Sequence, residues 1–261
     1  MSEGDGTTVR ITNPKVATLA PTWRRYRGVS VLFDNPGTRA GSGVTPLEDI
    51  PIDGPERQRL YDDLADVVTD VDLDCMRERF GFCPLPRYSY HVTICDGPNE
   101  RDIAADGTSH RAHVTAVINQ LPGSLSRLPA ALGFLCRARV LPTVSANPVT
   151  FEAASIAIWS HVLAARLEPD GRSSQVAFEC VARARAELAD DLQTQLDLRA
   201  QPWRPHVSLG YFPNCDAAKA ATATLARWNQ ALTTRPLPTI TFAAASIYGF
   251  TDMVSFLRLG V

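Results

Sequence analysis

The sequence predicts an α+β fold in which two similar halves of the chain form lobes that face each other. Three observations support this prediction. Runs rich in β-forming residues alternate with helix-like patterns along the chain. Each half contains one predicted strand that carries the same four-residue motif. A chain of 261 residues, 45% of them hydrophobic, suffices for one large domain or two closely packed lobes. We therefore expect one domain over residues 23–261.

In the first half, residues 1–22 mix Gly, Thr, Asp and Pro without periodicity, which predicts a flexible N-terminal arm. Residues 26–34 are rich in β-forming residues and end at an Asn-Pro-Gly turn, so they are expected to form a strand. Apolar residues near helical spacing predict one helix over residues 56–80. Residues 87–95 are then expected to form a second strand.

In the second half, residues 173–198 give the clearest helical pattern, with apolar positions on one face and charges between them. Weaker patterns predict the other elements. These are helices over 109–121, 124–135 and 216–232, a strand pair over 149–157 and 158–167, and strands over 205–211, 239–248 and 253–259. Strands and helices thus alternate through both halves, as an α+β fold requires.

Composition narrows the class of protein. The net charge is −2, without the basic excess typical of proteins that grip long nucleic acids, so a small nucleotide or short oligonucleotide is the better partner. Six scattered cysteines without a CxxC pair are typical of reduced thiols in a cytosolic protein. The first residues lack an apolar signal core, and no apolar run is long enough to span a bilayer. We therefore expect a cytoplasmic protein without membrane association.

The two copies of the motif are His91-Val-Thr-Ile and His206-Val-Ser-Leu. Side chains alternate between the two faces of a strand, so His91 and Thr93 are expected on one face and the apolar residues on the other. The same alternation places His206 beside Ser208. Each strand can then bury its apolar face and present an imidazole with a hydroxyl on the opposite face.

This combination suits the cleavage of a phosphodiester. In-line displacement at phosphorus needs a base for the attacking oxygen and an acid for the leaving oxygen. Two histidines can supply both near neutral pH, and the hydroxyls can donate hydrogen bonds to phosphate oxygens. The arrangement requires neither a metal nor a cofactor. Because the motif is short, the alternative is that both histidines are ordinary strand residues.

The residues His91-Val-Thr-Ile and Arg204-Pro-His206-Val-Ser-Leu-Gly resemble the motifs of the two-histidine (2H) phosphoesterases. That family includes RNA 2′,3′-cyclic phosphodiesterases and 2′-5′ oligonucleotide phosphodiesterases. The resemblance implies a bilobal α+β fold with both motifs lining a central cleft. It also implies a metal-independent hydrolase for a small nucleotide with a 2′,3′-cyclic or 2′-linked phosphodiester. Cleavage of a 2′-5′ or cyclic oligonucleotide signal, or nucleotide binding without turnover, are the alternatives.

Residues around the motifs are further candidates. In continuous strands, Arg87 and Arg204 would share the faces of the two histidines and could clamp phosphate, although solvated positions at the strand starts are as well supported. A nucleotide enzyme also needs an aromatic ring to stack on a base. The candidates are Tyr26, Phe33, Trp203 and Tyr248.

Other residues of chemical interest are expected to be structural. Alternation places Tyr211 on the face opposite His206, which predicts core packing. His110 and His113 share a helix face without a third ligand at metal spacing, and His161 is isolated, so no metal site is expected. Residues 96–102 form a predicted turn next to the first motif and could border the cleft.

Overall fold

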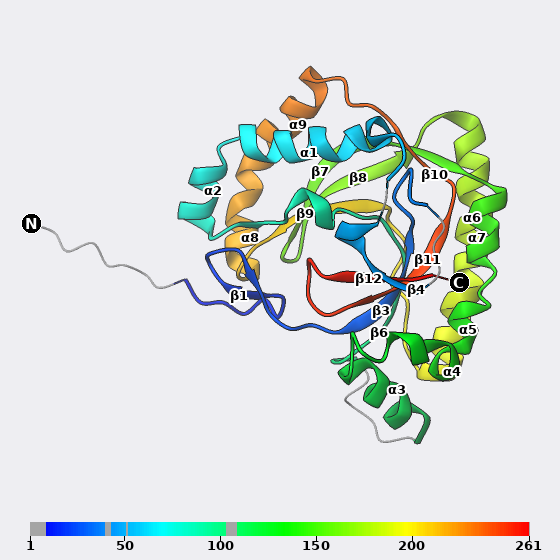
Figure 1. The fold of residues 1–261 in the computed structure, drawn as a ribbon. Coiled ribbons are helices and arrows are strands. Elements are labelled where there is room, and N and C mark those ends of the chain that lie inside the picture. Colours follow the sequence, from blue (N-terminus) through cyan, green and yellow to red (C-terminus); the bar gives the residue numbers. More distant parts are fainter. Residues whose placement is uncertain (1–8, 40–42, 51, 103–108, 261) are drawn as a thin grey trace, which may run out of the picture.

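The computed structural model describes residues 9–39, 43–50, 52–102 and 109–260 (Figure 1). Two antiparallel five-stranded sheets dominate it, with strand orders β10-β7-β8-β9-β5 and β4-β12-β11-β3-β6, and β1 and β2 form a separate pair. The strands are β1 Val16–Thr18, β2 Thr22–Trp23, β3 Gly28–Phe33, β4 Gly43–Pro46, β5 Cys83–Pro84, β6 Thr93–Asn99, β7 Val149–Trp159, β8 Val162–Pro169, β9 His206–Tyr211, β10 Ile240–Phe242, β11 Ala245–Phe250 and β12 Phe256–Gly260. The mixture of sheets and helices confirms the predicted α+β class.

Helices lie around the two central sheets (Figure 1). The α-helices are α1 Arg59–Asp70, α2 Leu73–Phe80, α3 Ser109–Asn119, α4 Leu128–Ala131, α5 Gly133–Cys136, α6 Val140–Ala146, α7 Gly171–Leu196, α8 Cys215–Ala221 and α9 Leu225–Thr234. The long helix α7 packs on β6, β7 and β8 and therefore touches both sheets. Its buried face carries Val181, Leu188 and Leu192 at helical spacing. Within the described residues, no helix combines the length and the apolar character needed to cross a bilayer.

The two sheets meet where the two motifs lie. An isolated antiparallel bridge joins Val92, just before β6, to Val207 in β9. Both valines are fully buried, as are the apolar residues Ile94 and Leu209 that follow in each motif. The predicted apolar faces of the motifs are thus in the core, at the junction of the sheets. The main-chain link holds the two motifs side by side.

Several elements differ from the sequence prediction. Shorter elements replace the helices expected over residues 124–135 and 216–232 and the strand expected over residues 239–248. The helix expected over residues 56–80 is divided into α1 and α2, because Asp72 adopts a left-handed conformation with φ 57° between them. The strand expected from residue 87 begins only at Thr93. Arg87–Ser89 form a 3₁₀ turn, started by Pro86 at φ −68° and closed by a hydrogen bond from the Ser89 N–H to the Pro86 carbonyl.

We expected a flexible arm over residues 1–22, but residues 9–22 include β1 and make defined contacts with the end of β9; residues 1–8 lie outside the described residues. The backbone N–H groups of Thr12 and Asn13 donate to the Pro213 carbonyl, just beyond β9. The Asn13 side chain, 1% exposed, donates to the Phe212 carbonyl at 2.8 Å. Polar contacts, which a hydrophobic pattern does not reveal, therefore hold this segment against the end of β9.

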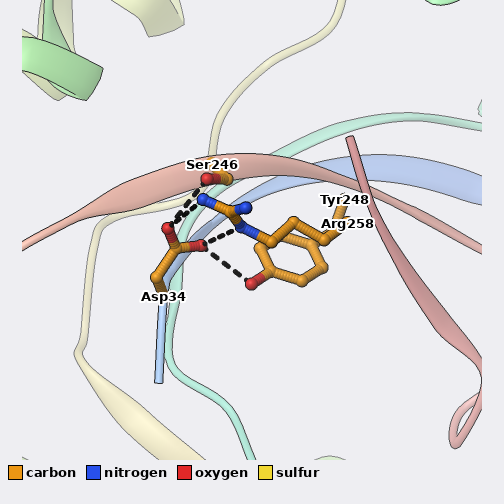
Figure 2. A network of polar contacts seen from close by, with 4 residues as sticks. All are labelled: Asp34, Ser246, Tyr248 and Arg258. Atoms are coloured by element: carbon orange, nitrogen blue, oxygen red, sulfur yellow. Dashed lines mark hydrogen bonds and ion pairs between the residues drawn. The ribbon is translucent and has the colours of Figure 1, made fainter. Parts of the chain in front are cut away.

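A buried carboxylate ties three strands of one sheet together (Figure 2). Arg258 on β12 donates to both oxygens of Asp34 at 3.1 and 2.8 Å. The hydroxyls of Ser246 and Tyr248 on β11 donate to the same carboxylate at 2.9 and 2.8 Å. Hydrogen bonds to both oxygens offset the free-energy cost of burying this carboxylate, and they fix the pairing of β3, β11 and β12.

Candidate active site

Both motifs border one cavity of about 750 Å³. His91 and Thr93 reach it from the start of β6, and His206 and Ser208 reach it from β9. All four side chains are half-buried, whereas the apolar residues between them are fully buried. The structure thus brings the four residues singled out by the sequence to one place.

The two imidazoles are held in the same way. His91 Nδ1 lies 2.7 Å from the Ser89 carbonyl, and His206 Nδ1 lies 2.7 Å from the Arg204 carbonyl. A carbonyl oxygen can only accept a hydrogen bond, so each Nδ1 carries the proton and donates it. In the neutral ring the other nitrogen, Nε2, is then unprotonated. Each histidine can therefore offer a basic Nε2 to the reaction.

An aromatic ring supports each imidazole. Phe256 on β12 packs against His91 with ring centroids 4.3 Å apart. Trp159 at the end of β7 meets His206 edge-on, with centroids 5.1 Å apart and an interplanar angle of 86°. The carbonyl contact and the aromatic contact together limit rotation of each ring, which favours one orientation of Nε2.

Both histidines favour the neutral form in the free protein. Burial lowers the pKa of His91 to about 4, although its hydrogen bond to Ser89 works in the opposite direction. Burial also lowers the pKa of His206 below its ordinary value. Asp96 raises the pKa of both imidazoles, whereas Lys15 lowers the pKa of both. A bound phosphate, being an anion, would raise both pKa values and help one ring to take up a proton.

Each motif ends in a β-bulge. The pairing of β6 with β3 shifts by one residue at Ile94, and the pairing of β9 with β8 shifts by one residue at Leu209. A bulge inserts one unpaired residue and reverses the alternation of side chains beyond it. The fifth residue after each histidine consequently lines the cavity as well: Asp96 after the first motif and Tyr211 after the second.

This bulge corrects the expectation for Tyr211. Strict alternation placed Tyr211 opposite His206, but the extra residue turns its ring toward the cavity. Trp23 contacts the same ring edge-on, with centroids 5.8 Å apart. Asp96, expected in a turn beside the cleft, is exposed within β6 and lines the cavity.

Of the two candidate arginines, neither side chain borders this cavity. Arg87 belongs to the 3₁₀ turn and pairs with Asp62 of α1, with Nε–Oδ1 at 2.6 Å. Its predicted position depended on a strand that does not extend back to residue 87. Arg204 is exposed beside Trp159 in a separate surface depression, and only its carbonyl contributes, by holding His206.

The candidate aromatic residues also separate. Tyr26 lines the cavity and stacks on Phe250 with centroids 6.0 Å apart. Trp203 instead supports β6, because its Nε1–H donates to the Thr93 carbonyl at 2.9 Å. Tyr248 is fully buried in the Asp34 network, and Phe33 is a core residue.

Three cations that line the cavity lacked a clear signal in the sequence: Lys15, Arg185 and the exposed Arg199. Arg185 of α7 donates from Nε to the Ile94 carbonyl at 2.7 Å and from Nη2 to the Gln201 carbonyl at 2.6 Å. It therefore fastens the first motif to the helix. Lys15 reaches the cavity from the N-terminal segment. It is one of only two lysines in the chain, but only the contacts of the folded segment reveal its position.

The remaining histidines lie elsewhere. His161, in the turn between β7 and β8, contacts Ser160 Oγ at 2.8 Å and Cys215 Sγ at 3.2 Å. His113 is exposed on α3, and the side chain of His110 lies outside the described residues. Within the described ranges, no group of three or more His, Cys, Asp or Glu side chains is arranged to hold a metal ion.

Comparison with known proteins gives a likeness of fold. The chain matches no protein-family model and no curated protein. Among solved structures it is similar to a conserved protein of unknown function, ATU0111 from Agrobacterium tumefaciens strain C58, at 12% identity and a TM-score of 0.51, over 94% of this chain and 90% of that one. It is also similar to Usb1 from Kluyveromyces marxianus, at 13% identity and a TM-score of 0.40, over 91% of this chain and 99% of that one. The likeness to the Agrobacterium protein shows a shared overall fold.

Proposed function

We propose that this chain is a metal-independent phosphodiesterase of the two-histidine type, with the two sheets as its lobes and the cavity between the motifs as its active site. Its substrate is a small nucleotide with a 2′,3′-cyclic or 2′-linked phosphodiester. One observation carries the proposal. Two imidazole–hydroxyl pairs, held by equivalent main-chain contacts, border a single cavity.

The mechanism assigns one role to each ring. The unprotonated Nε2 of one histidine takes a proton from the attacking water, and the protonated Nε2 of the other gives a proton to the leaving ribose oxygen. Water oxygen bonds to phosphorus as the ribose oxygen departs on the opposite side. Thr93 and Ser208 donate hydrogen bonds to the non-bridging oxygens, where negative charge develops. In a cyclic substrate, cleavage leaves a phosphomonoester on one ribose hydroxyl.

The cavity supports a small substrate. A volume of about 750 Å³ lies within the range of pockets that enclose a nucleotide-sized ligand. Tyr26 is the sequence-predicted aromatic residue that remains in position to contact a base or ribose. These features favour mononucleotides and short oligonucleotides.

The test is product formation from 2′,3′-cyclic mononucleotides and from 2′-5′ dinucleotides in EDTA. We expect the wild type to hydrolyse at least one of them. His91→Ala and His206→Ala should each lose roughly 100- to 10,000-fold in kcat, the usual contribution of a positioned acid or base. His113→Ala is the matched control, because His113 is exposed on α3, outside the cavity.

Three results would contradict the proposal. Activity that disappears in EDTA and returns with a divalent ion would exclude the metal-independent mechanism. Equal rates in the wild type and both motif variants would make the motifs structural. Tight nucleotide binding by a wild type that hydrolyses no member of the panel would indicate a binding module instead of an enzyme.

A further inference from the structure

Lys15 is held at the cavity by both its backbone and its side chain. Its N–H donates to Asn13 Oδ1 at 3.0 Å, and its carbonyl accepts from the Arg24 N–H at 3.0 Å. The Nζ atom lies 3.4 Å from the Tyr211 hydroxyl, 5.0 Å from the centre of the Tyr211 ring and 5.5 Å from that of Tyr26. The ammonium group is thus kept between two aromatic rings that both line the cavity.

Lys15 is a permanent positive charge in a site whose histidines favour the neutral form. Burial by itself would lower the pKa of Lys15, but Tyr211, Tyr26 and Asp96 outweigh it and raise this pKa above its ordinary value. Of the other cations that line the cavity, Arg185 already donates from Nε and Nη2 to two main-chain carbonyls, and Arg199 is exposed. The long contact to Tyr211 leaves Lys15 with N–H groups to offer to an anion.

The position of Lys15 is tied to the second motif. Tyr211 is the residue that the bulge in β9 turns toward the cavity, five residues after His206. Asp96 holds the equivalent place after His91, and its charge acts on Lys15 and on both imidazoles. Lys15 is therefore coupled to the groups that follow both motifs, as expected for a cation within the reaction site.

We propose that Lys15 is a substrate-binding residue, its ammonium group contacting a non-bridging phosphate oxygen together with the hydroxyls of Thr93 and Ser208. This inference rests on the proposed phosphodiesterase function and adds to the site a group from outside both motifs. A compact ammonium on a flexible stem fits the space between Tyr26 and Tyr211. Only two of the 26 lysine and arginine residues in the chain are lysines, so a lysine at position 15 departs from the general predominance of arginine.

A labelling experiment tests the contact directly. The other lysine, Lys219, is exposed on α8 and serves as an internal reference in the same sample. The rates at which an amine-reactive acetyl ester modifies Lys15 and Lys219 are measured by mass spectrometry, with and without uridine 2′-monophosphate. We expect the nucleotide to slow modification of Lys15 several-fold and to leave that of Lys219 unchanged. Inorganic phosphate should protect Lys15 at a higher concentration.

Kinetics supply the second measurement. Lys15→Met should lower kcat/KM by roughly 10- to 100-fold, since a charge-assisted hydrogen bond to phosphate is lost. Lys15→Arg should recover part of that loss, and Lys219→Met should match the wild type. Thermal unfolding of each variant checks that the N-terminal segment still packs. If Lys15 is purely structural, Lys15→Met changes the melting temperature, but the nucleotide does not slow the modification of Lys15 in the wild type.

The outcomes separate this inference from the proposed function. The role of Lys15 alone is overturned if the wild type is active and His91→Ala is not, while nucleotide fails to slow the labelling of Lys15 and Lys15→Met keeps the wild-type kcat/KM. If nucleotide protects Lys15 but the wild type hydrolyses no substrate, the contact between Lys15 and phosphate stands and the proposed phosphodiesterase function is rejected. If neither hydrolysis nor protection occurs with any nucleotide or with phosphate, both proposals fail.

Discussion

Replacement of His91 by glutamine should reduce the acid sensitivity of the protein. Burial lowers the pKa of His91 from 6.5 to about 4, while in the unfolded chain the same imidazole regains its ordinary pKa. Because the folded-state pKa is the lower one, neutral His91 contributes its stabilisation fully above pH 6.5. That stabilisation is lost as the pH falls from 6.5 toward 4, since the unfolded chain binds the proton first.

The size of the effect follows from the two pKa values. Their difference corresponds to about 3 kcal/mol of unfolding free energy once the pH is below both, and to about 2 kcal/mol at pH 5. Glutamine keeps a polar side chain but does not titrate. Between pH values of about 7.5 and 5, the wild type should therefore lose about 2 kcal/mol more than His91→Gln does. Carboxylates titrate in both proteins, so their contributions cancel in this comparison.

Urea unfolding followed by far-ultraviolet circular dichroism measures the two free energies at each pH. His113→Gln, at an exposed position on α3, is the matched control and should retain the acid sensitivity of the wild type. Equal losses in the wild type and in His91→Gln would refute the reasoning. They would mean that burial does not depress the pKa of His91.

Two further variants test other parts of the structure. Asp34→Ala leaves the guanidinium group of Arg258 without its buried partner and should destabilise the protein by about 3–5 kcal/mol in urea unfolding, whereas a change below about 1 kcal/mol would contradict the network in Figure 2. Arg87→Ala should change kcat/KM by less than about twofold, because Arg87 pairs with Asp62 in a partly exposed ion pair away from the cavity. A larger loss of kcat/KM would indicate that Arg87 contributes to the active site.

The motifs were predictable because polar and apolar residues alternate along each of them, and exposure and burial alternate in the same way. In His91-Val-Thr-Ile and His206-Val-Ser-Leu, strict alternation separates polar from apolar residues, and the structure buries Val92 and Val207 as expected. Their proximity is a property of the assembled sheets: a single bridge between two valines joins strands that are far apart in sequence. In the sequence, only the repetition of the motif indicates that the two strands lie close together.

Two of the failed site predictions share one physical cause, since each assumed a regular strand. Arg87 was placed by extending β6 backward through a turn started by Pro86. Tyr211 was placed by extending the alternation of β9 through a bulge. The bulge has no distinct local pattern, because it is set by pairing with a neighbouring strand, whereas the turn has a local signal in Pro86. Lys15 was missed for another reason: its segment is held by polar contacts to the end of β9.

Our last prediction concerns the roles of the two histidines in the proposed mechanism. Our hypothesis is that His206 is the acid that protonates the leaving oxygen and that His91 is the base. The charge of His206 is among the causes that lower the pKa of His91, which favours protonation of His206 first. A nucleoside p-nitrophenyl phosphodiester tests this, because its phenolate leaves without a proton. His206→Ala should lose far less activity on this substrate than on a 2′,3′-cyclic nucleotide, while His91→Ala should lose similar activity on both. The reverse pattern would exchange the two roles.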